Sequence, residues 1–259
     1  MIIDFNAYVG HWPFRRLPAR SAAEVLDLMD EAGVDVAAVS SLNSALYADP
    51  QEGNLELLDD VKKYGGRFVP LAVLNPRYPG WDDDLEECVD SGFKGIRLYP
   101  QYHNYLLSDD DCTKLSTRAT ELNLSVSIPV RLRDGRGRNW MDSARDVATL
   151  EVERLAAKLP NLKIVLLESS DVVDTALVEY GNIFFETSRM TSIIGGGIED
   201  LIQLVGASRL VFGSGMPLKY ISPALLKIKL LKESEDIKER ILWRNSSDLL
   251  RLVQNVKRQ

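Results

Sequence analysis

The chain has 259 residues, of which 45% are hydrophobic and 27% are charged, and its formal net charge is −7. This composition is that of an ordinary globular protein and excludes a disordered chain. No apolar run approaches the roughly 18 to 20 residues of a membrane span, so no membrane partner is expected. A net negative charge also disfavours binding to a nucleic acid backbone, which needs a basic face.

The start of the chain and its cysteines both indicate a cytoplasmic protein. The first residues read MIIDFNAY, without the basic and then apolar segments of a secretory signal. The only cysteines are Cys88 and Cys112. Both fall in predicted helices, where two unpatterned cysteines indicate buried thiols and not a disulfide framework. A chain of this length needs neither a disulfide nor a metal ion for stability.

Eight apolar runs bounded by turn residues predict eight β-strands. In chain order they cover 2–8, 36–41, 68–74, 95–99, 124–130, 163–169, 183–188 and 210–215. Helical patterns lie between nearly all of them. The first helix is the clearest, because Ser21 and Glu24 form a capping box before it and Gly33 ends it. Two further helical segments, at 222–232 and 236–256, follow the last strand.

The alternation of strand and helix predicts a single (β/α)8 TIM barrel, an α/β fold. Segments such as FVPLAVL and KIVLLES are almost continuously apolar, as parallel strands are when helices cover one side and a filled barrel interior the other. A doubly wound open sheet is the alternative, but no glycine-rich nucleotide fingerprint follows the first strand. Barrels of about 250 residues commonly form one domain, so we expect a single domain over residues 1–259.

Five segments at strand ends and near the end of the chain carry recognisable motifs. They read IIDFNAYVG, RFVPLAVLNP, GFKGIRLYP, PNLKIVLLES and ILWRNSSDLLRL. In this order along the chain, the motifs resemble the amidohydrolase-related family of metal-dependent TIM-barrel hydrolases and decarboxylases. The resemblance implies the same barrel, an active site at the carboxyl ends of the strands, and hydrolysis or decarboxylation of a small molecule.

The resemblance also implies that the five usual metal-ligand positions of that family are changed here. Histidines of the family are replaced by Asn6 and Tyr8 in the first strand, by Pro129 in the fifth and by Glu168 in the sixth, and its aspartate by Gly215. Tyrosine, proline and glycine offer no good ligand for a divalent ion, and an amide oxygen is a weak ligand for zinc. We therefore expect no bound metal ion and no cofactor.

Alternation along the strands predicts which side chains point into the barrel mouth. If positions 6 and 8 point inward, the same phase brings in a set of polar residues: Asp4, Asn6, Tyr8, Arg97, Tyr99, Arg131 and Glu168. We expect the guanidinium of Arg97 to replace the absent metal ion by neutralising Asp4 or Glu168, because an unpaired buried carboxylate is costly. The alternative is that these residues form purely structural ion pairs.

The candidate catalytic groups are two carboxylates and a histidine: Glu168, Asp4 and His103. A general base at Glu168 requires partial burial without a close cation, whereas pairing with Arg97 would lower its pKa. Those two roles therefore compete. His103 follows the fourth strand and is an acid or base candidate, although a lone histidine in a loop is commonly exposed to solvent.

The candidate substrate-binding residues are an amide, two tyrosines and two arginines. Tyr8 and Tyr99 could donate to an oxyanion, but a tyrosine at a strand end is more often a core residue. Arg131 opens the segment RLRDGRGRNW, which is either an anion-capturing lid or a solvated loop. The full set is Asn6, Tyr8, Arg97, Tyr99 and Arg131.

We therefore expect a hydrolase or decarboxylating lyase that acts on a small, anionic molecule at a metal-free barrel mouth. The alternative is a non-catalytic barrel that binds an anionic metabolite or a protein partner at the same place. A third interpretation is a metal site rebuilt from Asp4, Asn6, Glu168 and His103, which is a poor ligand set for zinc. The residues specify neither the substrate nor the oligomeric state.

Overall fold

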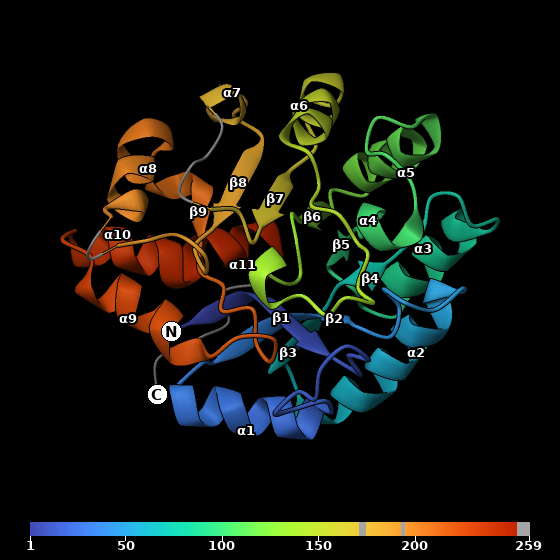
Figure 1. Ribbon diagram of the computed structural model, residues 1–259, viewed down its shortest axis with the longest axis horizontal. Coiled ribbons are helices and arrows are strands. Elements are labelled where there is room, and N and C mark those ends of the chain that lie inside the picture. The colour runs from blue at the N-terminus through green and yellow to red at the C-terminus, as the bar shows by residue number, and fades with distance from the viewer. Residues whose placement is uncertain (171–174, 193–194, 253–259) are drawn as a thin grey trace.

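The computed structural model describes residues 1–170, 175–192 and 195–252, in which parallel strands form a barrel surrounded by helices (Figure 1). The strands are β1 (Ile3–Val9), β2 (Val36–Ser41), β3 (Phe68–Pro70), β4 (Ala72–Val73), β5 (Gly95–Arg97), β6 (Ser125–Pro129), β7 (Ile164–Leu167), β8 (Ile183–Glu186) and β9 (Leu210–Val211). β1 to β3 pair in order, as do β4 to β9. Only Leu71 separates β3 from β4, so both belong to one strand of the predicted eight.

The first strand closes the barrel against the last. The backbone N–H of Phe5 donates to the carbonyl of Phe212 at 2.9 Å, and that of Tyr8 donates to the carbonyl of Met216 at 2.9 Å. All strand pairs of the described residues are parallel. The predicted single (β/α)8 barrel is confirmed.

The helices cover the outside of the barrel in the predicted alternation. α1 (Ala22–Ala32) begins at the expected capping box of Ser21 and Glu24, and it ends at Gly33, whose φ of 71° is in the left-handed region. The others are α2 (Pro50–Val61), α3 (Trp81–Asp90), α4 (Pro100–His103), α5 (Asp110–Glu121), α6 (Thr149–Lys158), α7 (Thr175–Val178), α8 (Gly197–Val205), α9 (Ile221–Leu230), α10 (Glu235–Glu239) and α11 (Asn245–Leu249), with short turns η1 (Lys62–Tyr64), η2 (Gly135–Gly137), η3 (Ala207–Arg209) and η4 (Arg240–Arg244).

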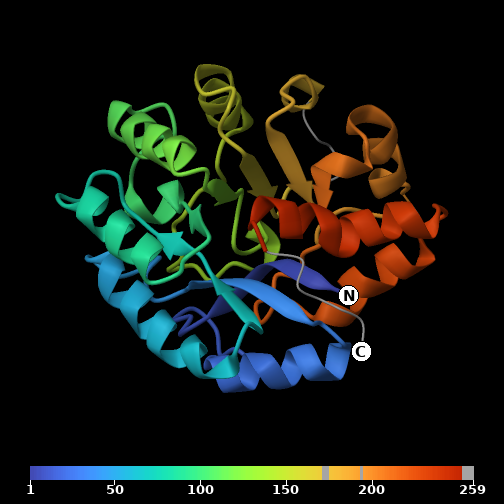
Figure 2. The ribbon, with the colours of Figure 1, turned by 180° about the vertical axis from the view of Figure 1, so that it is seen from behind.

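The long helix predicted over 236–256 is interrupted. Its described part consists of α10, the π-helical turn η4 and α11, and residues 253–256 of the prediction lie outside the described residues. α11 lies across the back of the barrel in the rear view (Figure 2). Leu249 and Leu250 there join a buried cluster with Ile3 and Phe5 of β1. The amino-terminal opening of the barrel is therefore sealed by apolar side chains.

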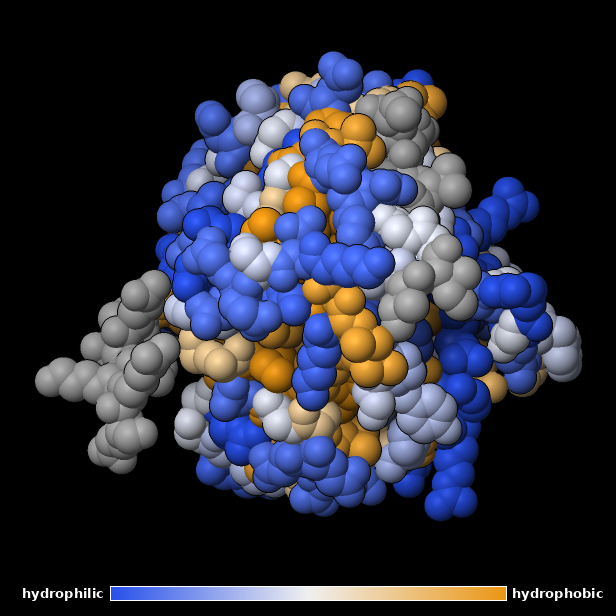
Figure 3. Space-filling model, turned by 90° about the vertical axis from the view of Figure 1, so that its left-hand side faces the viewer, coloured by the Kyte–Doolittle hydropathy of each residue, from blue (hydrophilic) through white to orange (hydrophobic). Residues whose placement is uncertain are grey.

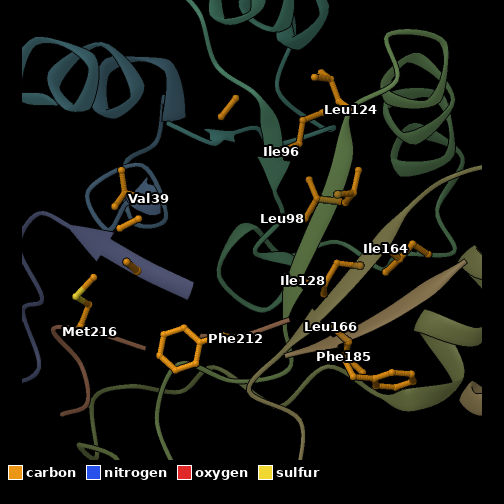
Figure 4. Packing of buried hydrophobic residues seen from close by; sticks show 14 of the residues in the cluster. Val39, Ile96, Leu98, Leu124, Ile128, Ile164, Leu166, Phe185, Phe212 and Met216 are labelled. Atoms are coloured by element: carbon orange, nitrogen blue, oxygen red, sulfur yellow. The ribbon is translucent and has the colours of Figure 1, made fainter. Parts of the chain in front are cut away.

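A larger apolar core lies between the strands and the surrounding helices. Val39 of β2, Ile96 of β5, Ile128 of β6 and Phe185 of β8 are among its strand residues, and Figure 4 shows them. All four are fully buried. Burial of this kind stabilises the fold by about 25 cal/mol for each Å² of apolar surface removed from water. The two predicted thiols, of α3 and α5, are buried and unbridged, as expected.

The carboxyl ends of the strands form the other opening, and the chain between β6 and α6 crosses it. This chain includes η2, the light green turn near the centre of Figure 1. It is tied to other loops of the mouth, because Asn139 donates to the carbonyl of Phe14 at 3.3 Å and Arg133 donates to the carbonyl of Leu218 at 3.3 Å. The polar residues of the mouth are therefore partly covered by this crossing segment.

The outer surface is mixed in polarity. On the side that carries α8 to α10, apolar side chains reach the surface in a narrow strip between polar ones (Figure 3). The exposed apolar residues of α8 and α9 are Leu204, Leu226 and Leu230. Within the described part of the chain, no helix combines the length and apolarity needed to cross a membrane.

Candidate functional site at the barrel mouth

Two buried glutamates face each other at the ends of adjacent strands. Glu168 follows β7 directly and is 2% exposed, while Glu186 is the last residue of β8 and is fully buried. The side-chain amide of Asn6 donates to both, at 2.8 Å to Oε1 of Glu168 and 3.0 Å to Oε2 of Glu186. The backbone N–H of Glu168 also donates to Oε2 of Glu186 at 3.1 Å. β1, β7 and β8 thus assemble one carboxylate pair.

Two cations neutralise this pair. Nζ of Lys219 lies 2.6 Å from Oε2 of Glu168, and Nε of Arg189 lies 3.1 Å from the same oxygen. The hydroxyl of Ser188 donates to Oε2 of Glu186 at 2.9 Å and accepts from Lys219 at 2.7 Å. Charges taken out of water need such close partners and further hydrogen bonds. Glu168 and Glu186 come from the ends of the neighbouring strands β7 and β8, while Ser188 and Arg189 come from the segment just after β8.

Burial and the nearby carboxylate of Glu168 raise the pKa of Glu186. Burial is the larger cause of the increase, and the negative charge of Glu168 adds to it. Lys219 and the backbone donors oppose the increase only in part. Glu186 therefore holds its proton to a higher pH than an ordinary glutamate, as carboxyl groups that share a site do.

The backbone of Glu168 has an uncommon conformation. Its φ is +60°, which few residues other than glycine adopt. Outliers of this kind persist only where the surrounding structure holds them, and they occur frequently at functional sites. The conformation turns the end of β7 so that the Glu168 side chain meets Lys219, Arg189 and Asn6.

Asp4 belongs to a separate buried unit at the start of β1. Its Oδ1 accepts from the backbone N–H groups of Asn6 at 2.9 Å and Ser214 at 3.0 Å, and its Oδ2 accepts from the hydroxyl of Ser214. Burial raises the pKa of Asp4 to about 7 despite these bonds. Asp4 is therefore partly protonated near neutral pH.

Arg97 does not pair with Asp4 or Glu168, so this prediction is wrong. Its guanidinium donates to the carbonyls of Phe5 at 2.8 Å and Ala7 at 2.9 Å, and further bonds go to the hydroxyls of two serines. β1 has an irregularity between positions 4 and 7 that interrupts its regular pairing with β2, and bulges of this kind disrupt the local ladder. The backbone carbonyls of this irregular segment therefore accept the hydrogen bonds of the arginine, and no carboxylate does.

Tyr8 and Tyr99 form an apolar part of the mouth. Both are fully buried and cluster with Trp12 and Leu42. The hydroxyl of Tyr99 bonds to that of Ser40 at 2.9 Å, whereas the Tyr8 hydroxyl has no hydrogen-bond partner among the described residues. Both rings therefore pack as buried core residues near the barrel mouth. Of the two hydroxyls, only that of Tyr8 lacks a partner among the described residues.

Arg131 and His103 do not join the carboxylate pair. Arg131 pairs with Asp146 at 2.7 Å and lines a separate cavity of about 240 Å³ that also contacts Leu177. The inward phase fails because β6 ends at Pro129, and alternation does not continue beyond the strand. His103 lies in α4, with Nε2 3.2 Å from the carbonyl of Ser44, and burial lowers its pKa.

The rebuilt metal site is therefore not assembled. Asp4 is bonded to Ser214, and Glu168 is paired with Lys219. His103 contacts the carbonyl of Ser44 and the rings of Tyr99 and Tyr105. No cluster of three or more histidine, cysteine, aspartate or glutamate side chains suited to a metal ion occurs in the described ranges.

A cavity of about 650 Å³ opens in front of the glutamate pair. Its basic lining residues are Arg15, Arg16, Arg133 and Lys219, and Ser188 and Ser214 also line it. No acidic residue is among its described lining residues. Burial lowers the pKa of Arg133, and the nearby charges of Arg15 and Arg189 lower it further. The cavity is thus strongly cationic and suits an anionic ligand.

Several residues of this site were not among the predicted ones. Glu186 and Ser188 lie in the predicted strand 183–188, where the alternation rule applied to the other strands would have indicated them. Arg189 and Lys219 lie in loops, where no periodicity operates. The missed residues are Arg15, Arg16, Arg133, Glu186, Ser188, Arg189, Ser214 and Lys219.

Comparison with known proteins agrees with the fold and the motifs. Residues 6–252 match the model of the amidohydrolase family, while no curated protein sequence matches the chain. The fold is shared with 5-carboxyvanillate decarboxylase from Sphingomonas paucimobilis, which is 16% identical with a TM-score of 0.74 over 96% of this chain and 98% of that one. An uncharacterised TIM-barrel protein from Bordetella bronchiseptica is 18% identical, with a TM-score of 0.73 over 96% and 98% of the two chains.

A third structure with this fold contains a metal ion. It is a dihydroxybenzoic acid decarboxylase from a Polaromonas species with bound manganese and the inhibitor 2-nitroresorcinol, 18% identical with a TM-score of 0.71 over 97% of each chain. At such identities the structural neighbours establish a common fold, whereas the family model covers nearly the whole sequence. The chain therefore belongs to the amidohydrolase family.

Proposed function

We propose that the protein is a hydrolase or decarboxylating lyase that acts on a small carboxylic acid without a divalent metal ion. The observation that carries the proposal is the cationic cavity in front of the buried glutamate pair. The substrates named for two structural neighbours, 5-carboxyvanillate and dihydroxybenzoic acid, are aromatic acids. They support the same substrate class by analogy of fold.

The five positions that bind metal in the resembling family do not fit such an ion here. Pro129 and Gly215 have no donor side chain, and Asn6 directs its NH₂ group at the carboxylates. Both oxygens of Glu168 already have partners: Asn6 bonds to Oε1, while Lys219 contacts Oε2. The remaining free oxygens, of the Asn6 amide and the Tyr8 hydroxyl, are neutral, and neutral oxygens alone are weak ligands.

The arginines of the cavity provide the anion-binding part of the site. Arg15 and Arg133 both donate to the carbonyl of Leu218, at 2.8 Å and 3.3 Å, so their guanidinium groups are held close together. Guanidinium groups bind carboxylates with two parallel hydrogen bonds. A substrate carboxylate between these arginines would be bound beside Lys219, which lines the same cavity.

The residues behind the cavity provide acid and base groups. Ser188 lines the cavity and bonds to Glu186, whose pKa is raised, and Ser214 lines it and bonds to Asp4, whose pKa is about 7. Each serine hydroxyl therefore connects a carboxyl group of raised pKa with the ligand space. In a decarboxylation the bond to CO₂ breaks, the electron pair stays on carbon, and a proton from this side replaces the lost group.

The residues predicted from the sequence have different roles in this proposal. Glu168 anchors Lys219 and does not act as a free base, because a cation lies 2.6 Å from its Oε2. Asn6 positions both glutamates. Arg97, Tyr99 and His103 do not line the cavity.

The test is turnover by metal-free protein. Chelator-treated protein is incubated with 2,6-dihydroxybenzoate and 5-carboxyvanillate, and loss of the acid and release of CO₂ are measured. We expect turnover that neither chelator nor added Mn²⁺ changes, a higher KM for Arg133→Met, and a lower kcat for Ser188→Ala. Turnover that appears only after Mn²⁺ is added contradicts the proposal.

A second candidate function is a barrel that binds an anionic metabolite without converting it. All four oxygens of the glutamate pair already have partners from the protein, and networks of this kind are also found in purely structural roles. Saturable binding of an acid without turnover, unchanged in Glu186→Gln, would favour this function.

A further inference from the structure

The side chain of Lys219 lies against two of the positions that the family resemblance assigns to metal ligands, Glu168 and Gly215. Its Nζ contacts Glu168, which stands at one of these positions, and Glu168 is bonded to Asn6, which stands at another. The lysine comes from the loop after β9, where Lys219 donates its backbone N–H to the carbonyl of Gly215 at 3.0 Å. This turn directs the lysine back over the end of its own strand.

Glycine at position 215 provides the space for this lysine. A Cβ atom on Gly215 would lie 2.5 Å from Cε of Lys219 and 2.7 Å from Oε1 of Glu168. Atoms of ordinary side chains do not approach so closely. The aspartate usual at this position is therefore incompatible with the lysine as it lies here. An acidic side chain at position 215 would require the ends of the Lys219 and Glu168 side chains to move.

The ammonium group retains donor capacity toward the cavity. Among the described residues its hydrogen-bond acceptors are Oε2 of Glu168 and Oγ of Ser188. An ammonium group has three N–H donors, so one remains for a ligand. Lys219 lines the cationic cavity, and its side chain is 26% exposed. It is thus the cation that touches both the buried carboxylate and the ligand space.

We propose that the ammonium group of Lys219 replaces, in position and in electrostatic role, the divalent metal ion that the family resemblance implies at this site. It neutralises Glu168 and directs its remaining N–H at an oxygen of the bound acid, where it stabilises negative charge during the reaction. The inference rests on the proposed function for the substrate contact, but the occupation of the ion's place does not depend on turnover.

The first experiment uses ligand-free, full-length protein and two cations, Mn²⁺ and methylammonium. Free Mn²⁺ is measured by electron paramagnetic resonance, and thermal stability is measured for wild type, Lys219→Ala and the exposed control Lys229→Ala. We expect no Mn²⁺ binding by wild type. Lys219→Ala should gain either one bound Mn²⁺ or a saturable rise in Tm of several degrees with methylammonium, because the truncation leaves a space beside a buried carboxylate that has lost the nearer of its two cations.

Two results would overturn the inference. One is Mn²⁺ binding by wild type as tight as that by Lys219→Ala, and the other is that neither cation stabilises Lys219→Ala more than Lys229→Ala. If Lys219→Ala does not fold, Lys219→Met and Lys219→Met/Glu168→Gln replace it. In these variants Glu168 keeps only Arg189 as a cationic partner, so removing its negative charge should recover part of the lost Tm. Additive losses would contradict the role of the ammonium group.

The outcome is distinguishable from a failure of the proposed function. Cation-dependent stabilisation of Lys219→Ala without turnover of any acid would leave Lys219 in the place of the ion and would refute only catalysis. Turnover that is fully retained in Lys219→Met would refute the electrostatic role and leave the proposed function intact.

Discussion

The hydroxyl of Ser214 donates to the carboxylate of Asp4, and the backbone N–H of the same serine donates to its other oxygen at 3.0 Å. These bonds favour the ionised form, but complete burial outweighs them and the pKa of Asp4 is raised from 3.8 to about 7. Because Ser214 also lines the cavity, this pair connects the protonation of a core residue with the ligand space.

The pH dependence of stability follows from this shift. Between about pH 4 and pH 7 the folded state holds a proton on Asp4 that the unfolded state has released. The contribution of Asp4 is therefore fully present below pH 4 and is lost as pH rises through 7, at up to about 1.4 kcal/mol per pH unit. Asp4→Asn should flatten this part of the curve, with the slope from Glu186 remaining. Urea unfolding from pH 4 to 8 measures the free energy of unfolding of each protein. Asp111→Asn, at a half-exposed aspartate, is the control. Equal slopes with pH for Asp4→Asn and wild type would contradict the prediction.

Replacement of Arg97 should destabilise the fold. Arg97→Met leaves four buried oxygen atoms without their donor, two of them the carbonyls of Phe5 and Ala7. Leaving a buried polar group unsatisfied lowers the free energy of unfolding by about 1 to 3 kcal/mol. We expect a total loss of about 3 kcal/mol for Arg97→Met. Arg154→Met, at a half-exposed arginine of α6, should change it by no more than about 0.5 kcal/mol. A loss for Arg97→Met as small as that of Arg154→Met would show that these bonds contribute little.

Adding a methyl group at position 215 should lower the free energy of unfolding more than adding one at another glycine with a similar φ angle. Gly215 and Gly33 have φ values of 76° and 71°, but only Gly215 has neighbours within 4 Å of an added Cβ. Gly33→Ala should therefore lose about 1 kcal/mol from backbone strain alone, and Gly215→Ala should lose about 2 kcal/mol more.

A double-mutant cycle separates the contact from the strain. Gly215→Ala in a Lys219→Ala background should lose less than in wild type, because Cε of the lysine no longer meets the added methyl group. Chemical denaturation of the four proteins gives the coupling energy. A coupling energy of zero would mean that the glycine is required for its φ angle only.

Arg133 should matter for anion binding. Arg133→Met removes one of the charges that line the cavity, and we expect the Kd for a dihydroxybenzoate measured by calorimetry to rise about tenfold. Arg136, in the same loop, has a side chain that is 92% exposed, and Arg136→Met should leave the Kd unchanged. Equal effects of the two substitutions would indicate a diffuse attraction by the loop and not a bound position for the acid.

The polar mouth could be predicted only in part. The phase of β1 correctly brings Asn6 and Tyr8 into the mouth, and Glu168 lies there as expected. The same rule fails for Arg131, because the strand has ended before it. It also fails to foresee the partners of Arg97, because the irregularity in β1 offers it carbonyl groups. Alternation tells which way a side chain points and does not specify its partner.

By itself the sequence determined the barrel, because eight apolar runs separated by helical patterns are local properties that each segment carries alone. Only the tertiary structure decided which cation meets the carboxylates. Glu168 and Lys219 are 51 residues apart, and they meet because the barrel closes and glycine at position 215 leaves room for the lysine. No periodicity specifies such a contact between a strand end and a loop, since it depends on the curvature of the closed sheet and on the space left by its neighbours.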